Sequence, residues 1–263
     1  MNKSGAAIST KAFAGERIAK VLARAGLCSR RDAERWITAG RVSVNGETLS
    51  SAARNVEASD VVVVDGKPLP QKEKARLWRY HKPSGLVTTH KDEKGRNTVF
   101  DALRNELPRV VSIGRLDLNS EGLLLLTNDG GLARELEHPS KGWVRRYRVR
   151  VHGKPDPEIL ESLKSGVTID GVRYGPIIAS LERSQGAANA WLVMSLTEGK
   201  NREIRKVLAH LGLAVTRLIR VSYGPYQLGS LERGEVEEIS GKVITEQLGH
   251  KPNTKPPKKA RHA

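Results

Sequence analysis

The chain has 263 residues, with 45 Lys and Arg against 29 Asp and Glu, which gives a formal net charge of +16. A surplus of this size favours a polyanionic partner such as nucleic acid, with membrane surfaces and acidic proteins as alternatives. No run approaches the roughly 18 apolar residues that span a bilayer, and the first residues lack an apolar core followed by a cleavage site. The single cysteine, Cys28, excludes an internal disulfide and a cysteine-based zinc site, so we expect a cytoplasmic protein.

Both ends of the chain are basic. Residues 1–15 hold two lysines and no acid, and residues 249–263 hold five cations and no acid. We expect a flexible tail over 1–15 and a disordered tail over 249–263. The part between them, 16–248, keeps a net charge of +9, so the surplus is not confined to the tails.

Two short helices and a hairpin are predicted first. Ile18, Val21, Leu22 and Ala25 recur at helical spacing before Gly26. Ser29, with an acid three residues later, has the shape of a capping box, and the apolar stripe that follows it ends at a glycine. The runs 42–44 and 61–64 each precede an Asn-Gly or Asp-Gly pair, which is typical of strands that enter tight turns.

This helix pair is strongly cationic. Between residues 17 and 41 seven cations face two acids, and composition alone is equally consistent with an ordinary solvated surface. The order helix, Gly, Ser-Arg-Arg, helix, Gly-Arg-Val-x-Val-Asn-Gly resembles the S4 RNA-binding domain over about 50 residues. The resemblance implies phosphate contacts from five side chains: Arg17, Lys20, Arg30, Arg31 and Arg35.

A polar, proline-punctuated segment from Pro68 to Lys74 predicts a boundary near Ala75, and hence domains over 16–75 and 76–248. Short β-rich runs then alternate with turns, at 77–80, 110–113, 123–127, 147–151 and 191–196. The clearest helix runs from about Arg202 to Leu211. The pattern predicts an α+β domain built around a mainly antiparallel sheet.

The densest local signal is a polar loop that contains Asp117, within the segment 114–130 between two apolar runs. Asp117, Asn119 and Glu121 imitate the opening of an EF-hand loop, but the twelfth position is Asn128 instead of a bidentate glutamate. Taken alone, Asp117 is also consistent with a turn aspartate that bonds its own backbone.

Distant motifs accompany this loop. They are Tyr80-His81-Lys82-Pro83-Ser84-Gly85, Tyr147 in a predicted strand, Glu198-Gly199-Lys200-Asn201-Arg202-Glu203-Ile204-Arg205, and Arg217-Leu218-Ile219-Arg220. In order and spacing they resemble the RsuA/RluB family of pseudouridine synthases over residues 16–235. One departure is Arg145-Arg146-Tyr147, where relatives often have Lys-x-Tyr, and it keeps the charge. The run 217–224 and the basic tail look more like the large-subunit RluB branch than the small-subunit RsuA branch.

The resemblance implies an isomerase that converts a specific uridine of ribosomal RNA to pseudouridine. It implies 23S rRNA or a large-subunit assembly intermediate as the partner, a monomer, and neither cofactor nor metal. Asp117 is the implied nucleophile, Arg205 the cation beside it, and Tyr147 the ring against the extruded uracil. The implied RNA path is lined by Arg115, Lys200 and Arg202.

A carboxylate suits this chemistry because it can attack the sugar carbon or the base ring and still leave afterwards. It must be ionised, which a cation within about 4 to 6 Å favours. A phosphate contact for Arg205 and a core position for Tyr147 remain alternatives. Also open are a 16S rRNA substrate and a non-catalytic RNA-binding or ribosome assembly factor.

Overall fold

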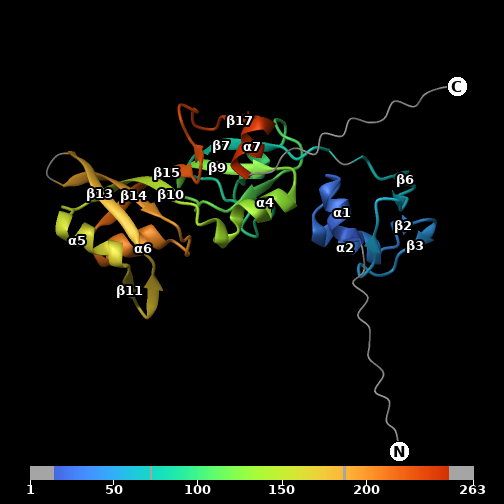
Figure 1. Cartoon of the computed structure of the whole chain (residues 1–263), viewed down its shortest axis with the longest axis horizontal. Coiled ribbons are helices and arrows are strands. Elements are labelled where there is room, and N and C mark those ends of the chain that lie inside the picture. Colours follow the sequence, from blue (N-terminus) through green and yellow to red (C-terminus); the bar gives the residue numbers. More distant parts are fainter. Residues whose placement is uncertain (1–14, 72, 186–187, 249–263) are drawn as a thin grey trace, which may run out of the picture. The chain divides into compact units, whose positions relative to one another are not determined.

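The structure is a computed structural model that describes residues 15–71, 73–185 and 188–248 (Figure 1). The tails predicted over 1–15 and 249–263 lie outside the described residues, apart from Gly15. Contacts divide the chain into two compact units, Met1–Lys74 and Ala75–Ala263. Among the described residues, no helix is long and apolar enough to cross a membrane.

The first unit combines two helices with short strands. The helices are α1 (Ile18–Arg24) and α2 (Arg30–Thr38), and β1 (Glu16–Arg17) pairs with β4 (Asn55–Val56). A four-stranded sheet has the order β3 (Glu47–Thr48), β2 (Val42–Val44), β5 (Val62–Val64) and β6 (Lys67–Pro68). Both predicted helices and both predicted strands are confirmed.

Local chemistry explains these elements. The Ser29 hydroxyl oxygen accepts from the Asp32 backbone N–H at 3.1 Å, which caps α2 as the sequence predicted. Ile18, Leu22 and Ile37 are fully buried in one core cluster between the helices and the sheet. Asn45 and Gly46 both adopt positive φ, the geometry of a two-residue hairpin turn.

The second unit is built on one nine-stranded sheet. Its main path has the order β13 (Ile177–Gln185), β14 (Asn189–Leu196), β10 (Arg145–His152), β15 (Ala214–Tyr223), β9 (Glu121–Thr127), β7 (Leu77–Lys82) and β17 (Val236–Ile239). β16 (Tyr226–Gln227) pairs with β15, and β8 (Val111–Ile113) pairs with β9. Every pairing in this sheet is antiparallel except the parallel contact of β15 with β9, so the predicted α+β fold is confirmed.

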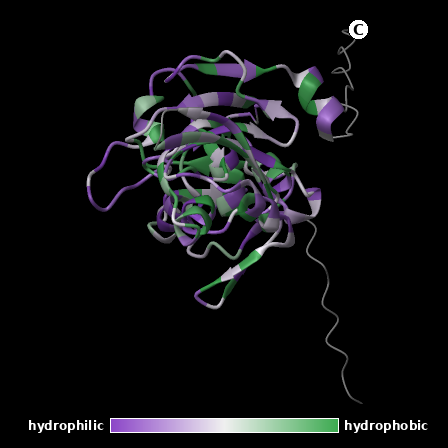
Figure 2. Ribbon diagram, turned by 90° about the vertical axis from the view of Figure 1, so that its left-hand side faces the viewer, coloured by the Kyte–Doolittle hydropathy of each residue, from purple (hydrophilic) through white to green (hydrophobic). Residues whose placement is uncertain are grey.

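Helices cover both faces of this sheet. They are α3 (Val99–Ala102), α4 (Gly130–Glu137), α5 (Pro157–Ser162), α6 (Glu203–His210) and α7 (Gly241–Leu248), and the hairpin β11 (Val167–Ile169) with β12 (Val172–Tyr174) projects beside them (Figure 1). The helix predicted near 202–211 is confirmed as α6. Hydrophobic residues gather among the packed elements and hydrophilic ones in the outer loops (Figure 2).

The core of this unit has separate parts on the two faces. On one face, one cluster lies under α5 and α6 and includes Val149 and Leu208, and another lies under α3 and includes Leu124. On the opposite face, a cluster with α4 includes Leu123 and Leu125. Tyr147 packs against both clusters of the first face, so it marks the junction between the two halves of that face.

The junction is close-packed at Gly122. Its Cα lies in register with Arg220 of β15, and its φ is +99°. A Cβ added there would lie 2.3 Å from the Arg220 carbonyl oxygen and 2.8 Å from its nitrogen. A glycine is therefore required where the strand that follows Asp117 meets β15.

Candidate active site

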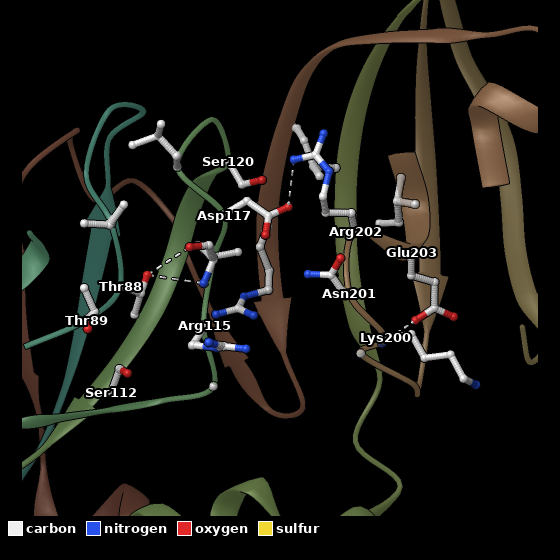
Figure 3. Close-up of a pocket in the computed structure, with 18 of the residues that line it drawn as sticks. Thr88, Thr89, Ser112, Arg115, Asp117, Ser120, Lys200, Asn201, Arg202 and Glu203 are labelled. Carbon is white, nitrogen blue, oxygen red and sulfur yellow. Dashed lines mark hydrogen bonds and ion pairs between the residues drawn. The ribbon is translucent and has the colours of Figure 1, made fainter. Parts of the chain in front are cut away.

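A cleft of about 900 Å³ opens over this junction. Its lining comes from the segment 87–96, the loop 112–120, the start of β10, the segment 199–204, and β15. Asp117, Arg115, Lys200 and Arg202 all contribute to it (Figure 3). Tyr147 lines it as well, so the structure brings Asp117 together with predicted residues up to 85 positions away in sequence.

The loop that carries Asp117 is held in place by hydrogen bonds that its backbone carbonyl groups accept. The Thr88 hydroxyl donates to the Leu116 carbonyl at 2.9 Å, and the Gly85 N–H donates to that of Leu118 at 2.8 Å. Arg205 Nη2 donates to the Asn119 carbonyl at 2.9 Å. The carbonyl of Asp117 itself accepts from the Ser120 N–H at 3.0 Å. These carbonyls face the protein interior, whereas the Asp117 carboxylate faces the cleft, and its side chain is 35% exposed.

Lys82 lies under this loop and was given no role from the sequence. It is fully buried at the end of β7, and its Nζ lies 2.9 Å from the Pro83 carbonyl oxygen and 2.9 Å from that of Ser120. It also lies 3.2 Å from the Asp117 carbonyl oxygen and 3.4 Å from that of Leu118. The signal for it was present, since the Lys-Pro pair follows a predicted strand within one of the family-like motifs.

Burial lowers the pKa of Lys82 to about 8, while the negative charges of Asp117 and Glu121 act in the opposite direction. The ammonium is therefore charged at neutral pH and becomes neutral within the alkaline range. Its charge is well placed to hold the loop, because three carbonyl oxygens of the Asp117 turn converge on it, together with that of Pro83.

Arg202 is the cation nearest to the Asp117 carboxylate, with Nη1 at 3.7 Å from Oδ2 (Figure 3). It occupies the N-cap position of α6 with φ +52°. The other non-glycine residues with positive φ in the described chain are Asn or Asp, which tolerate that conformation better. The strained backbone at Arg202 therefore coincides with the point where its side chain meets Asp117.

Arg205, the cation that the sequence assigned to this position, lies one turn further along α6. Its guanidinium donates to the Asn119 and Val215 carbonyls, at 2.9 and 3.1 Å, and no ion pair joins it to Asp117 in the described structure. Burial and the neighbouring Arg202 lower the pKa of Arg205, and the charge of Asp117 partly opposes them. The structure thus gives Arg205 a place on the loop backbone, and gives Arg202, expected only to line the RNA path, the contact with the carboxylate.

Tyr147 is half-buried in β10, in register with Met194 and Arg220. Its neighbour Arg220 is almost fully buried, donates from Nε to the Leu123 carbonyl at 2.8 Å, and lines the cleft. The Tyr147 ring joins two hydrophobic clusters and also forms part of the cleft wall. Tyr147 therefore packs against the core and lines the cleft at the same time, so its core position does not exclude the role expected from the sequence.

The other predicted cleft residues differ in their exposure and in whether their charge is already paired with an acid. Arg115 is exposed on the Asp117 loop (Figure 3). The Lys200 ammonium pairs with Glu198 and lies 5.9 Å from the centre of the Tyr174 ring. Burial raises the pKa of Glu203, which lines the same wall and accepts from the Lys200 N–H at 2.9 Å.

The five cations predicted to bind RNA in the first unit lie on α1, on α2 or beside them. Arg30 and Arg31 are exposed, with no ion pair in the described structure. Lys20 pairs with Glu16 at 2.6 Å and Arg35 with Asp32 at 3.1 Å, while Arg17 donates to the Ala53 carbonyl. All five have at least part of their cationic group near the surface, and two are charge-balanced by acids.

The residues that imitated a calcium loop have other partners. Glu121 binds Arg217 through both carboxylate oxygens, at 2.8 and 3.0 Å, and Arg233 lies 3.2 Å from it. Asn128 Oδ1 accepts from the Arg76 N–H at 2.8 Å. In the part of the chain that the structure describes, no group of three or more His, Cys, Asp or Glu side chains could hold a metal ion.

Comparison with known proteins assigns both units. Residues 76–210 match the model of the RNA pseudouridylate synthase family, and residues 16–62 match that of the S4 domain. The chain is 48% identical to an uncharacterised RNA pseudouridine synthase of Rickettsia prowazekii (strain Madrid E), over 88% of this chain and 97% of that protein.

Two further relatives refine the comparison. The chain is 41% identical to ribosomal large subunit pseudouridine synthase B of Pseudomonas aeruginosa, over 90% of this chain and 64% of that longer protein. A crystal structure of a pseudouridylate synthase superimposes with a TM-score of 0.61 at 25% identity, covering 88% of this chain and 99% of that one. The chain therefore belongs to the RNA pseudouridylate synthase family and carries an S4 domain in front of its catalytic domain.

Proposed function

We propose that this enzyme isomerises a uridine of ribosomal RNA, most specifically of the 23S rRNA, and that Asp117 is the nucleophile. The position of Asp117 carries the proposal: its carboxylate lies at the cleft, on a loop whose carbonyls from residue 116 to 120 all accept hydrogen bonds, with a cation 3.7 Å away. The names of relatives at 41 and 43% identity, ribosomal large subunit pseudouridine synthase B, support the large-subunit substrate.

The reaction breaks the N1–C1′ bond, turns the base and joins C5 to C1′. Asp117 forms a covalent bond to the sugar or the base, and leaves again when the new bond has formed. Arg202, with its guanidinium 3.7 Å from the carboxylate, orients that carboxylate at the cleft when the nucleotide displaces water. Preorganisation matters here, since the bound carbonyls fix the carboxylate before substrate arrives.

Tyr147 offers its ring to an extruded uracil and its hydroxyl for removal of the proton from C5. The exposed Arg115, beside Asp117, fills the space left by the base or binds a flanking phosphate. All residues in these roles come from one catalytic unit of one chain, which supports a monomer as the active form. A monomer that works on ribosomal RNA in the cytoplasm completes the proposal.

Tritium release from [5-³H]uridine-labelled ribosomal RNA tests the nucleophile. We expect Asp117→Asn to release no tritium above background while it binds the RNA within about two-fold of wild type, because the substitution removes one charge and keeps the shape. Asp170→Asn is the matched control, since Asp170 lies in an exposed turn with φ +50°, which asparagine tolerates.

Two outcomes would refute parts of this proposal. Turnover by the Asp117→Asn protein would exclude Asp117 as nucleophile. A wild-type protein that binds the RNA and releases no tritium would be a non-catalytic RNA-binding factor. Mapping pseudouridines in 16S and 23S rRNA from cells lacking the gene identifies the substrate, and a missing site in 16S rRNA would replace the large-subunit assignment.

A further inference from the structure

The two faces of the strand group β13, β14, β10 and β15 differ in what covers them. Helices α5 and α6 pack on one face through Leu160, Leu163, Ile204, Val207 and Leu208 (Figure 1). Their partners on β10 are Val149 and Val151, and Tyr147 packs against the same cluster. Side chains alternate along a strand, so the residues between these must face the opposite side.

Those intervening residues on β10 are all arginines: Arg146, Arg148 and Arg150. The contact of Arg148 fixes their direction, because its guanidinium carbon lies 4.9 Å from the centre of the Trp191 ring on β14. Register places Arg150 directly between Trp191 and Arg217. Arg183 of β13 is in register with Trp191 on its other side, so a row of cations crosses the sheet.

Acidic side chains balance only part of this charge. Glu182 accepts from Arg148 at 2.9 and 3.1 Å, and Glu121 accepts from Arg217. No ion pair involves Arg146, Arg150 or Arg183 within the described residues. Three of the five arginines on this face therefore lack a counter-charge.

The position of Arg150 is electrostatically unfavourable for the isolated fold. It stands directly opposite Arg217 on a neighbouring strand, where like charges destabilise a sheet. Its Nε is buried and has no hydrogen-bond partner among the described residues. An anion over the face would offset the repulsion between these guanidinium groups.

The chemistry of the face fits RNA. Alternate residues of β10 lie about 6.4 to 6.8 Å apart along the strand at their Cα atoms, so the arginines form a regular row that suits a repeating polyanion. Trp191 itself is buried, and the Arg148 guanidinium that covers its ring is a flat group of the kind that bases stack on. Ser180 and Ser195 carry hydroxyls on the same face. A membrane or an acidic protein would use the charge but not this surface.

We propose that this face, defined by Arg146, Arg148, Arg150, Arg183 and Arg217, is a second RNA-binding surface on the sheet side opposite α5 and α6. It binds a segment of the RNA substrate that flanks the target uridine, in single-stranded or irregular form. The inference rests on the RNA substrate proposed above, but not on Asp117 being the nucleophile.

The salt dependence of RNA binding tests it, with the full-length protein and a ribosomal RNA fragment that extends beyond the target stem. The variant Arg146→Gln, Arg150→Gln, Arg183→Gln removes the three cations without a counter-charge. We expect its slope of log K against log[salt] to be less steep by about 2, because each lost contact to a single strand contributes about 0.7. The control, Lys154→Gln, Lys164→Gln, Lys242→Gln, removes the same charge from exposed positions elsewhere and is expected to keep the wild-type slope.

An unchanged slope in the triple arginine variant, or an equal change in the control, would overturn the proposal. A loss of binding to pre-ribosomal particles without a loss for free RNA would assign the face to a protein partner, and would also overturn it. Tritium release is not the readout, so an inactive protein that keeps this salt effect would refute only the proposed catalysis.

A second measurement covers the case in which the triple variant unfolds. A photocrosslinker attached through Ser180→Cys, an exposed position on this face, leaves every arginine in place. We expect crosslinks to nucleotides that flank the target uridine, and the same probe attached through Ser162→Cys on α5 should give none. Equal crosslinking from both positions would contradict a specific surface.

Discussion

Replacing Lys82 by methionine removes the ammonium beneath the Asp117 loop and keeps most of the buried volume. The Asp117 carbonyl retains the Ser120 N–H and the Leu118 carbonyl retains the Gly85 N–H, so two carbonyls, those of Pro83 and Ser120, lose the donor that the structure gives them. An unsatisfied buried acceptor costs about 1 to 3 kcal/mol, which gives a loss of about 2 to 6 kcal/mol.

The buried charge itself has the opposite effect. Lowering the pKa of Lys82 from 10.5 to about 8 corresponds to about 3 kcal/mol of destabilisation at neutral pH, at 1.36 kcal/mol per unit. The two effects nearly cancel, so we expect Lys82→Met to be at most about 3 kcal/mol less stable than wild type. Activity should suffer more, by about 10- to 100-fold in kcat, because the carboxylate is no longer held in one place.

The pH dependence gives the sharper test. The folded pKa of Lys82 lies below the unfolded value, so the unfolded chain binds more protons between pH 8 and 10.5 and stability should rise across that window. Activity should fall as the pH rises through about 8, the pKa of Lys82 in the folded protein, because the neutral amine binds the loop less well. Urea unfolding and tritium release at each pH would measure both, and Lys82→Met should abolish the rise in stability. A wild-type activity that stays constant up to pH 10, or a variant with normal kcat, would refute the role of Lys82.

Three further predictions follow from the same site. Gly122→Ala should lower the free energy of unfolding, measured by urea titration, by about 2 to 6 kcal/mol, because the new Cβ clashes with Arg220 and φ is positive. Gly130→Ala in α4 is the control, and it should be neutral or stabilising because the space around Gly130 is open. Arg202→Gly should release backbone strain and raise stability by about 1 kcal/mol, while kcat falls at least 10-fold. An unaltered kcat would exclude a catalytic role for the contact with Asp117. Lys206→Gln is the control on the same helix. Burial raises the pKa of Glu203, so wild-type stability should fall as the pH rises above the usual glutamate range, and Glu203→Gln should remove that slope in thermal unfolding between pH 4 and 8; an identical slope would show that Glu203 does not titrate in the fold.

Many elements of the fold could be predicted from the local sequence. The Ser29 cap, the apolar stripe around Ile37 and the Asn45-Gly46 turn each depend on residues within one turn of chain, and each was found in the structure as predicted. The apolar run of β9 and the helical spacing of α6 were equally clear. The family also followed from the sequence, because its motifs are ordered along the chain.

Several elements gave no usable local pattern. β13 lies at the edge of the sheet and exposes the apolar residues Ile178 and Leu181, so its sequence shows no simple alternation of apolar and polar residues. β15 mixes arginines with apolar residues, since its charges are met by partners on other strands. α4 begins with two glycines, and its stability depends on the Asp129 cap and on burial of Leu132 and Leu136.

The sequence by itself determined that Asp117 lies in a polar loop of a pseudouridine synthase and that cations and Tyr147 accompany it. Only the tertiary structure decided which cation meets its carboxylate, since Arg202 and Arg205 are three residues apart and their directions depend on how α6 begins. It also decided that Lys82 contacts the loop from beneath, and that three arginines of one sheet face form no ion pair with any residue that the structure describes. These properties arise from contacts between residues distant in sequence, and spacing along the chain does not encode which charged groups will lie within a few ångströms of one another.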